Sequence, residues 1–493
     1  MSTPELELSA PRVSVDAQRW PDVARVPGGL RARVAAVVAD RLFRRAAARL
    51  DVRVEYPDGT VLGAGGETGS TTGTDCRILP RMIIRRPDNF ARRLGHDGLI
   101  GFGEAYMAGD WTASDPVAVL TPFAAEIGTL IPLRLQRLRR LFVTKQPAAE
   151  RNTEQNSQSN ISRHYDLSNA LFNTFLDRSM TYSSALFDEL PAHWDALATA
   201  QDRKIDRLLD AANVGPGTRL LEIGTGWGEL CVRAAQRGAV VRSVTLSEEQ
   251  RTLARERVAA AKLSERVQID LLDYRAVDGE YDAIVSVEMV EAVGYDYWPT
   301  YFRSLDRLLR PGGLVALQAI TMPHDRMTET RDTYTWIHKY IFPGGMLPST
   351  ESIDVTTRAL TSLRTIDRLR FGEHYAETLR LWRERFVAHG DRVGDIGFDA
   401  TFRRMWEFYL AYSEAGFGRD ISTSSRSCSG RRTSDEHMVG VLPHHRDRPG
   451  PAHADPGDHL HRRAPYRTLQ RRGRLVGSRL RGGGRSCSGA RQR

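Results

Sequence analysis

The chain has little of several features that define common protein classes. It holds four cysteines among 493 residues, and their spacing indicates neither a disulfide framework nor a metal site. No stretch approaches the ~20 apolar residues of a membrane-spanning helix. The first 20 residues carry acids and no apolar core, so we expect no signal peptide. Together these absences favour a protein of the reducing cytoplasm.

Lysine is missing from residues 418–493, although arginine is abundant there. This region holds 17 Arg against 6 Asp and Glu. The excess is larger than the net charge of the whole chain, which is +9, so the residues before it are slightly acidic. Because the basicity belongs to one tail and not to the body, we predict that the chain does not bind nucleic acid.

Composition divides the chain, which is too long for one ordinary core, into four parts. Residues 1–145 mix helical and strand-like stretches and predict a small α+β N-terminal domain. Residues 146–160 are polar and predict a linker. From 161 to 417 strands alternate with helices, which is typical of a parallel α/β domain. Residues 418–493 are expected to form a disordered tail.

Helical and hairpin patterns recur in the N-terminal domain. Residues 30–50 repeat apolar residues at helical spacing, and residues 52–63 predict a hairpin around a Pro-Asp-Gly turn. As a helix, residues 132–145 (PLRLQRLRRLFVTK) form an apolar stripe with a basic surround, typical of docking on anionic membranes. A helix packed on its own domain is the equal alternative. The domain is therefore expected either to dock lipid or to form a homodimer.

The composition changes abruptly after Phe417, and we interpret the change as a reading-frame shift in a GC-rich gene. With plausible codons for residues 419–430, starting two bases later gives Gly-Tyr-Leu-Asp-Val-Val-Gln-Ile-Val-Leu-Gly, which is typical of a β-strand. Simple disorder is the alternative. The frame-shift hypothesis predicts that the natural last strand is missing, which would expose an apolar sheet edge, and that the tail has no function of its own.

A glycine-rich loop follows the first strand of the predicted α/β domain. Residues 220–230 (LLEIGTGWGEL) run from an apolar strand into Gly224, Gly226 and Gly228, and a helical pattern follows. Glycine lets the backbone approach a ligand at the carboxyl end of a strand. The spacing differs from a dinucleotide fingerprint, because the third glycine comes one position early and Glu222 precedes the loop.

Three further segments continue this fold in order. Residues 271–277 place Asp273 and Tyr274 where a third strand should end, suited to the amino group and ring of adenine. Residues 281–294 predict a fourth strand, and residues 308–320 predict a fifth after a Pro-Gly-Gly turn. The order favours the Rossmann-like, doubly wound sheet of a class I S-adenosylmethionine methyltransferase over an unrelated doubly wound domain.

Segments around this sheet carry a more specific resemblance. They are GLIGFGEAYMAGDW (98–111), ISRHYDLSNALFNTFLDRSMTYSSALFD (161–188), VEMVEAVG (287–294), WIHKYIFPGGMLPS (336–349) and HYAETLRLWRERF (374–386). The chain resembles the cyclopropane-fatty-acyl-phospholipid synthase family over roughly residues 75–417, closest to its tuberculostearic-type branch. The resemblance implies transfer of a methyl group from S-adenosylmethionine to the double bond of a phospholipid acyl chain.

That chemistry sets the demands on the site. An alkene that attacks a sulfonium methyl becomes a carbocation, so the site must be dry and tolerate positive charge, as aromatic faces can. A base then removes a proton. Loss from the added methyl closes a cyclopropane, and we expect loss from a neighbouring carbon to leave a methylene branch. In the family the implied base is a bicarbonate, held here, by motif, at Ser184, Glu291, Gln318, Ile320 and Tyr375.

Two of these positions depart from the family pattern. Ser184 stands in place of a cysteine and Gln318 in place of a histidine. Both can hydrogen-bond an oxyanion, but Gln318 cannot shuttle a proton as histidine can. The departure favours methylene or methyl branching over ring closure. A second hypothesis makes Glu291 the base itself if burial raises its pKa.

The resemblance also implies the residues that hold S-adenosylmethionine. The segment before the sheet supplies Tyr182 and Ser183. The sheet supplies Gly224, Gly226, Thr245, Leu246, Gln250, Asp273 and Tyr274, to which the loop itself adds Glu222 and Gly228. Glu288 is interpreted as a strand-end residue, and Trp298 and Trp336 as packing residues.

Three functions are weighed on this basis. The leading one is a cytoplasmic lipid C-methyltransferase, peripheral at the inner membrane surface. N-methylation of a small amine is the second, and it would need no lipid-docking domain. The third is a product of a truncated gene that binds cofactor or lipid without turnover. The acyl chain, the head group and the need for a partner reductase to saturate a methylene product are left open.

Overall fold

A computed structural model describes residues 14–63, 79–126, 147, 152–153, 156, 167–418 and 437–443. The elements of its N-terminal part are α2 (Pro21–Ala24), α3 (Gly29–Ala47), β1 (Arg53–Glu55), β2 (Val61–Leu62), β3 (Arg81–Ile84), α4 (Pro87–Asp97), α5 (Leu99–Ala108), β4 (Trp111–Ala113) and α6 (Pro116–Glu126). The segment 132–145, predicted to dock on membranes, lies outside the described residues.

The N-terminal part is the predicted α+β unit. Its four strands follow the order β2-β1-β3-β4, and β1 pairs with β2 antiparallel, as expected of a hairpin within residues 52–63. β3 lies parallel to β1 and antiparallel to β4. α3 covers most of the helix predicted over residues 30–50. None of the helices in the described ranges combines the length and apolarity that a membrane span requires.

A second set of elements carries the larger sheet. In chain order they are α9 (Asn169–Phe172), η2 (Trp194–Ala196), α10 (Leu197–Ala211), β5 (Arg219–Ile223), α11 (Glu229–Gln236), β6 (Val240–Thr245), α12 (Glu248–Ala260), β7 (Val267–Leu271), η3 (Tyr274–Ala276), β8 (Tyr281–Val287), α13 (Val290–Val293), η4 (Tyr295–Tyr297), α14 (Trp298–Leu308), β9 (Leu309–Ile320), α15 (His324–Thr330), α16 (Trp336–Tyr340), α17 (Thr350–Leu360), β10 (Asp367–Arg370), α18 (Gly372–Ala388), α19 (Gly390–Asp395), α20 (Ala400–Phe417) and β11 (His437–Pro443).

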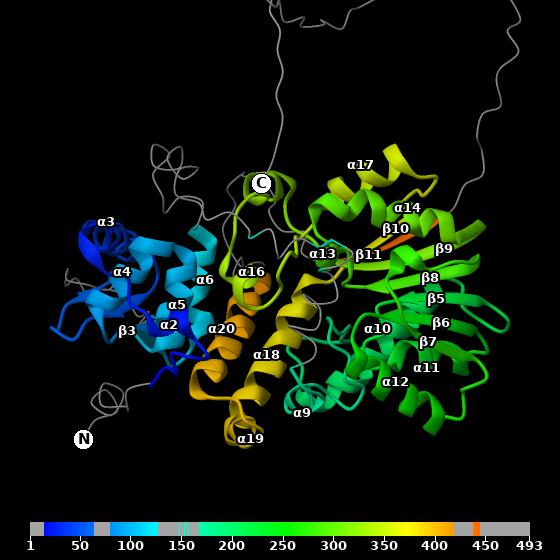
Figure 1. The fold of residues 1–493 in the computed structure, drawn as a ribbon, viewed down its shortest axis with the longest axis horizontal. Coiled ribbons are helices and arrows are strands. Elements are labelled where there is room, and N and C mark those ends of the chain that lie inside the picture. Colours follow the sequence, from blue (N-terminus) through cyan, green and yellow to red (C-terminus); the bar gives the residue numbers. More distant parts are fainter. Residues whose placement is uncertain are drawn as a thin grey trace, which may run out of the picture. The chain divides into compact units, whose positions relative to one another are not determined.

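The larger sheet has seven strands in the order β10-β11-β9-β8-β5-β6-β7 (Figure 1). β5 to β9 pair in parallel, and β11 is antiparallel to both of its neighbours. From β5 the chain adds β6 and β7 on one side of the sheet and then β8 and β9 on the other. Open parallel sheets bind ligands beyond the carboxyl ends of their strands at such a change of order. This is the predicted doubly wound, class I methyltransferase architecture.

Apolar side chains point to both faces of the larger sheet, and helices cover both faces. Successive residues of a strand point to opposite faces, so Leu220 and Leu221 of β5 belong to different cores. Leu221 packs in the core shared with α14 and α17, and Leu220 in the one shared with α10, α11 and α12. Both faces are therefore buried, as expected of a parallel sheet.

The strand β11 corrects the expectation that the domain lacks its last strand. It fills the place between β9 and β10, with Val439 opposite Gln318. The reason lies in its sequence, HMVGVLP, in which short apolar stretches suit a pleated strand, and in the unpaired N–H and C=O groups that the edge of β9 offers. A segment from the compositionally unusual tail thus completes the sheet.

The predicted linker does not separate two hydrophobic cores. One core contains Phe102 and Trp111 from the N-terminal part together with Trp382 of α18 and Phe408 of α20. The rings of Phe102 and Phe408 lie 6.4 Å apart, and α20 contacts both α5 and α6. The N-terminal part therefore packs directly on α20.

A buried ion pair organises the N-terminal part. Arg93 of α4 is 2% exposed and its Nε donates to Asp110 Oδ2 at 2.9 Å, while Arg86 Nε lies 2.7 Å from Asp110 Oδ1. The Arg93 guanidinium also donates to the backbone carbonyls of Val23 and Arg25. Each buried charge is thus compensated, as burial requires.

Replacing Asp110 by alanine should lower the free energy of unfolding by about 3–5 kcal/mol, because it leaves an unpaired guanidinium in the core. Urea denaturation followed by circular dichroism measures the change. Asp210→Ala is the control, since Asp210 is 71% exposed and pairs with Arg237 on the surface. It should cost less than about 1 kcal/mol. Equal losses in the two variants would contradict the buried-pair interpretation.

Candidate active site

The glycine loop lies directly after β5, as predicted. Gly224 and Gly226 have φ of +96° and +52°, a region that side chains disfavour. A Cβ on Gly224 would come within 2.8 Å of the Met289 side chain, whereas a Cβ on Gly226 would meet nothing within 4 Å. Gly224 therefore leaves room for Met289, and Gly226 leaves the backbone bare, in the lining of a cavity at the carboxyl ends of β5 and β6.

This cavity brings together most residues predicted to hold the cofactor. Those that line it are Tyr182, Ser183, Glu222, Gly224, Gly226, Thr245, Leu246, Gln250 and Tyr274. Apolar residues such as Ile223 and Val244 alternate with these polar groups. A cavity at this edge, apolar with a few placed polar groups, is the usual form of a cofactor site in α/β folds.

Two predicted cofactor residues do not line the cavity. A Cβ on Gly228 would lie 2.9 Å from the Ala254 Cβ, so this glycine lets α11 pack against α12. Asp273 holds Arg275 instead, accepting from its Nε at 2.8 Å and its Nη2 at 2.6 Å. The structure therefore gives both residues structural contacts, while Tyr274 next to Asp273 faces the cavity.

Glu222 is a buried acid on the cavity wall. Its Oε2 accepts a hydrogen bond from Ser243 Oγ at 2.5 Å, and that hydroxyl lies 2.7 Å from Thr225 Oγ1. Burial raises the pKa of Glu222 to about 8. A neutral carboxyl at this place can donate as well as accept a hydrogen bond.

Lys204 of α10 is a cavity residue that the sequence analysis missed. It is 2% exposed, and its Nζ donates to Ser183 Oγ at 2.7 Å. Burial lowers its pKa to about 8. The signal was present in the sequence, because Lys204 is spaced four residues from both Ala200 and Leu208, which lie on the buried face of the helix.

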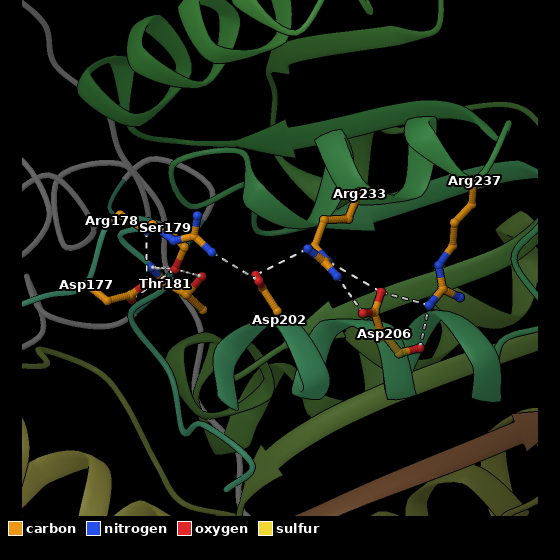
Figure 2. A network of polar contacts seen from close by, with 8 residues as sticks. All are labelled: Asp177, Arg178, Ser179, Thr181, Asp202, Asp206, Arg233 and Arg237. Atoms are coloured by element: carbon orange, nitrogen blue, oxygen red, sulfur yellow. Dashed lines mark hydrogen bonds and ion pairs between the residues drawn. The ribbon is translucent and has the colours of Figure 1, made fainter. Parts of the chain in front are cut away.

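The segment 177–184, which carries the predicted Tyr182, Ser183 and Ser184, is joined to α10 and α11 by a polar network. Figure 2 shows Arg178 reaching Asp202 on α10, which also pairs with Arg233 of α11. Within the segment, Ser179 donates from its N and its Oγ to the two oxygens of Asp177, both at 2.9 Å. This network fixes one wall of the cavity.

Thr245 and Gln250, which also line the cavity, are hydrogen-bonded to each other. Thr245 Oγ1 donates to Gln250 Oε1 at 3.0 Å. Ser247 begins α12 as its N-cap, and its side chain accepts from Gln250 N at 3.2 Å. The two predicted residues are therefore brought together by the start of a helix.

A second polar cluster lies beside the cavity and contains all five residues predicted to hold a bicarbonate. Its centre is Glu288, which follows β8. Glu288 Oε1 accepts from Ser184 N at 3.1 Å and from Gln318 Nε2 at 2.8 Å, and Glu288 Oε2 accepts from Tyr375 OH at 3.1 Å. The interpretation of Glu288 as a mere strand-end residue therefore misses its contacts.

Glu291 and Ile320 complete this cluster. Glu291 is 7% exposed, and its Oε1 accepts a hydrogen bond from Ile320 N. Burial, with a smaller contribution from the charge of Glu288, raises the pKa of Glu291 to about 8. Among the described residues, Glu291 Oε2 and Gln318 Oε1 are buried without a hydrogen-bond partner. Such orphaned atoms need an explanation, and a bound ligand or a retained proton supplies one.

The cavity and the cluster are built from consecutive residues. Val287 and Met289 line the cavity, whereas the side chain of Glu288 between them accepts a hydrogen bond from Gln318 in the polar cluster. In the same way Ser183 lines the cavity while Ser184 donates to Glu288. Whatever binds in the cavity therefore lies next to the carboxylate.

Aromatic rings pack around Tyr182, which lies in segment 177–184. The ring of Tyr182 lies 5.3 Å from Phe172 and 5.2 Å from Trp382, and its hydroxyl is 2.8 Å from Tyr409 OH. By contrast Trp298 donates to Val290 O, and a Cβ on Gly103 would meet Trp336 at 2.5 Å. These contacts fit the interpretation of the two tryptophans as packing residues.

Comparison with known proteins identifies relatives. The family model described as mycolic acid cyclopropane synthetase matches residues 152–424. The tuberculostearic acid methyltransferase UfaA1 of Mycobacterium tuberculosis is 56% identical over 83% of this chain and 94% of its own length. The cyclopropane-fatty-acyl-phospholipid synthase of Escherichia coli K12 is 35% identical over 69% of this chain and 85% of its own.

A solved structure gives the same picture. The cyclopropane synthase MmaA2 from Mycobacterium tuberculosis is 26% identical, with a TM-score of 0.50, over 58% of this chain and 97% of that one. The fold, the glycine loop and the sequence similarity agree. The chain belongs to the mycolic acid cyclopropane synthetase family.

Proposed function

We propose that this chain transfers a methyl group from S-adenosylmethionine to the double bond of an unsaturated phospholipid acyl chain, giving a methylene- or methyl-branched fatty acid, with a cyclopropane as the closest variant. It is an S-adenosylmethionine-dependent C-methyltransferase. The observation that carries the proposal is the adjacency of the glycine-loop cavity to the carboxylate cluster, through the residue pairs 183–184 and 287–288.

The residues present fit S-adenosylmethionine. The bare backbone at Gly226 admits close approach, Tyr274 offers a ring, and Glu222 and Gln250 offer polar side chains. Bound there, the cofactor supplies an electrophilic methyl group. The chain's own part is to exclude water and to hold the positive charge that arises on the substrate, for which the rings of Tyr182 and Tyr375 are available.

Balancing the atoms refines the expected products. Addition of the methyl leaves a cation on the neighbouring carbon. Loss of a methyl proton at that stage closes a ring. A hydride shift to the cation, followed by loss of a methyl proton, gives the methylene branch instead. Direct loss of a proton from a neighbouring chain carbon would give an internal double bond. The expectation that such a loss leaves a methylene branch is therefore wrong. A saturated branch also needs a hydride donor, which a partner reductase would supply.

An exposed apolar face supports peripheral binding to a membrane. Leu30, Val34, Val37 and Val38 of α3 are 78%, 59%, 54% and 51% exposed, at helical spacing along one side. Exposed arginines on the same helix flank this stripe, at positions 31, 33, 41 and 45. Apolar side chains with a basic surround suit the surface of an anionic bilayer. We propose that α3 docks on it and brings the site to its substrate.

The frame-shift hypothesis is kept as a proposal. The family match ends at residue 424, shortly after α20, so most of the tail has no counterpart in the family model. In this proposal, β11 stands in for the strand that the restored frame would encode. Restoring the frame would then return a better-fitting strand to the same place between β9 and β10.

Lipid mass spectrometry tests the activity. Cells that express the chain, fed oleate and methionine labelled at its methyl group, should gain a labelled lipid heavier by the mass of one CH₂ group. Fragmentation separates the ring from the methylene branch, and we expect the branch. A version with the frame restored after Phe417 should give at least as much product. No labelled lipid from either version would contradict the proposed function.

Vesicle sedimentation tests the docking face. The double variant Val34→Glu, Val38→Glu should bind vesicles of anionic phospholipid about tenfold more weakly or worse, because it removes apolar contact and adds repulsion. Val355→Glu is the matched control, since Val355 on α17 is 60% exposed but lies outside the stripe. Unchanged binding by the double variant, or an equal loss in the control, would argue against α3.

Stability should fall as the pH rises toward 8. An unfolded glutamate releases its proton near pH 4.5, whereas folded Glu291 keeps it to about pH 8. The folded state therefore binds more protons between these values, and the free energy of unfolding decreases with rising pH there. Glu291→Gln should flatten part of this slope in urea titrations at several pH values. An identical slope in the variant would show that Glu291 is not buried in its neutral form.

A further inference from the structure

The carboxylate of Glu288 collects donors from three distant parts of the chain. They are the backbone N–H of Ser184, the side-chain amide of Gln318 on β9 and the hydroxyl of Tyr375 on α18. A carboxylate that accepts three hydrogen bonds is well suited to carry a negative charge. The set is the kind of cradle that would otherwise hold a small oxyanion, and here the chain fills it with its own side chain.

The backbone of Glu288 is in a strained conformation, which is typical of residues at functional sites. Its φ is +52°, which is unfavourable for a residue with a side chain, and its N–H donates to Gln318 O at 2.8 Å. Such strain persists where the surroundings impose it and is concentrated at functional sites. Glu288 is the first residue after β8, and this backbone conformation places its side chain among the three donors. Val287 and Met289 on either side line the cavity.

We propose that Glu288 is the catalytic base of this chain and takes the place of a bicarbonate ion. The inference rests on the proposed function, because it concerns the proton that the substrate must lose. Ser184, Gln318 and Tyr375 already donate to the carboxylate, so a second anion at this place would compete for the same donors. It would also meet the charge of Glu288 itself.

The step balances without a further reactant. A C–H bond of the transferred methyl group breaks, and its electron pair forms the new carbon–carbon bond of the ring or the C=C bond of the branch. The proton passes to the Glu288 carboxylate, which returns it to solvent after the product leaves. Glu291 nearby retains its own proton near neutral pH because burial raises its pKa to about 8, so two adjacent negative charges are avoided.

The test uses the full chain, vesicles with oleoyl phospholipid and S-adenosylmethionine, in buffer stripped of carbon dioxide. The wild type should work at the same rate with and without added bicarbonate. Glu288→Gln keeps the size but not the basicity, and should be slower by about 100-fold or more. Glu288→Gly empties the cradle, so it should be equally slow in stripped buffer and should recover in part when bicarbonate is added.

Two controls separate catalysis from folding. Binding of S-adenosylhomocysteine, followed by calorimetry, should be unchanged in both variants, because Glu288 does not line the cavity. Glu377→Gln on α18 removes another buried carboxylate, one that accepts from Arg380 Nη2 at 2.8 Å outside the cluster, and should keep wild-type activity.

The outcomes distinguish the two proposals. A wild type that loses activity in stripped buffer and regains it with bicarbonate would overturn the role of Glu288 while upholding the methyltransferase. Wild-type rates from Glu288→Gln would overturn it as well. A wild type that forms no product in either buffer would overturn the proposed function and this inference together.

Discussion

A negative charge held inside the protein sets the conditions for the rest of the site. Glu288 is only partly exposed, and its carboxylate is compensated by donors at positions 184, 318 and 375, which three separate elements supply. Each donor has to arrive within about 3 Å for the charge to be tolerated. The loop before α10, the end of β9 and the start of α18 are therefore tied to one point. Since neighbouring residues line the cavity at the glycine loop, its wall is fixed by the same requirement.

The helices after the sheet connect the two halves of the described chain. α18 carries Tyr375 into the carboxylate cluster, and Trp382 on the same helix lies in the core that also contains Trp111 of the N-terminal part. Tyr106 of α5 donates from its hydroxyl to Glu407 of α20 at 2.9 Å. The N-terminal part and the carboxylate cluster are thus joined through contacts of α18 and α20.

Local patterns in the sequence were sufficient to predict the fold. Strand-like segments that alternate with helices, the glycine loop and the Pro-Gly-Gly turn indicated the parallel sheet, and motif resemblance brought Ser184, Glu291 and Gln318 together. Glu288 and Lys204 were missed because their importance comes from burial and from partners distant in sequence. Gly228 and Asp273 fitted the motif, but their contacts depend on α12 and on Arg275, which pattern alone does not show. β11 was missed because its composition resembles the tail, while the open edge of β9 determines its pairing.

The position of β11 has a consequence for how the protein is made. β9 carries Gln318 and leaves the ribosome well before residue 437, so its outer edge stays unpaired while the intervening helices are synthesised. During that interval the nascent chain displays a long apolar strand beside an unfinished site, the state in which chains associate wrongly. A chain cut short before residue 437 would therefore keep the edge of β9 open and would leave β10 without the strand that joins it to the sheet.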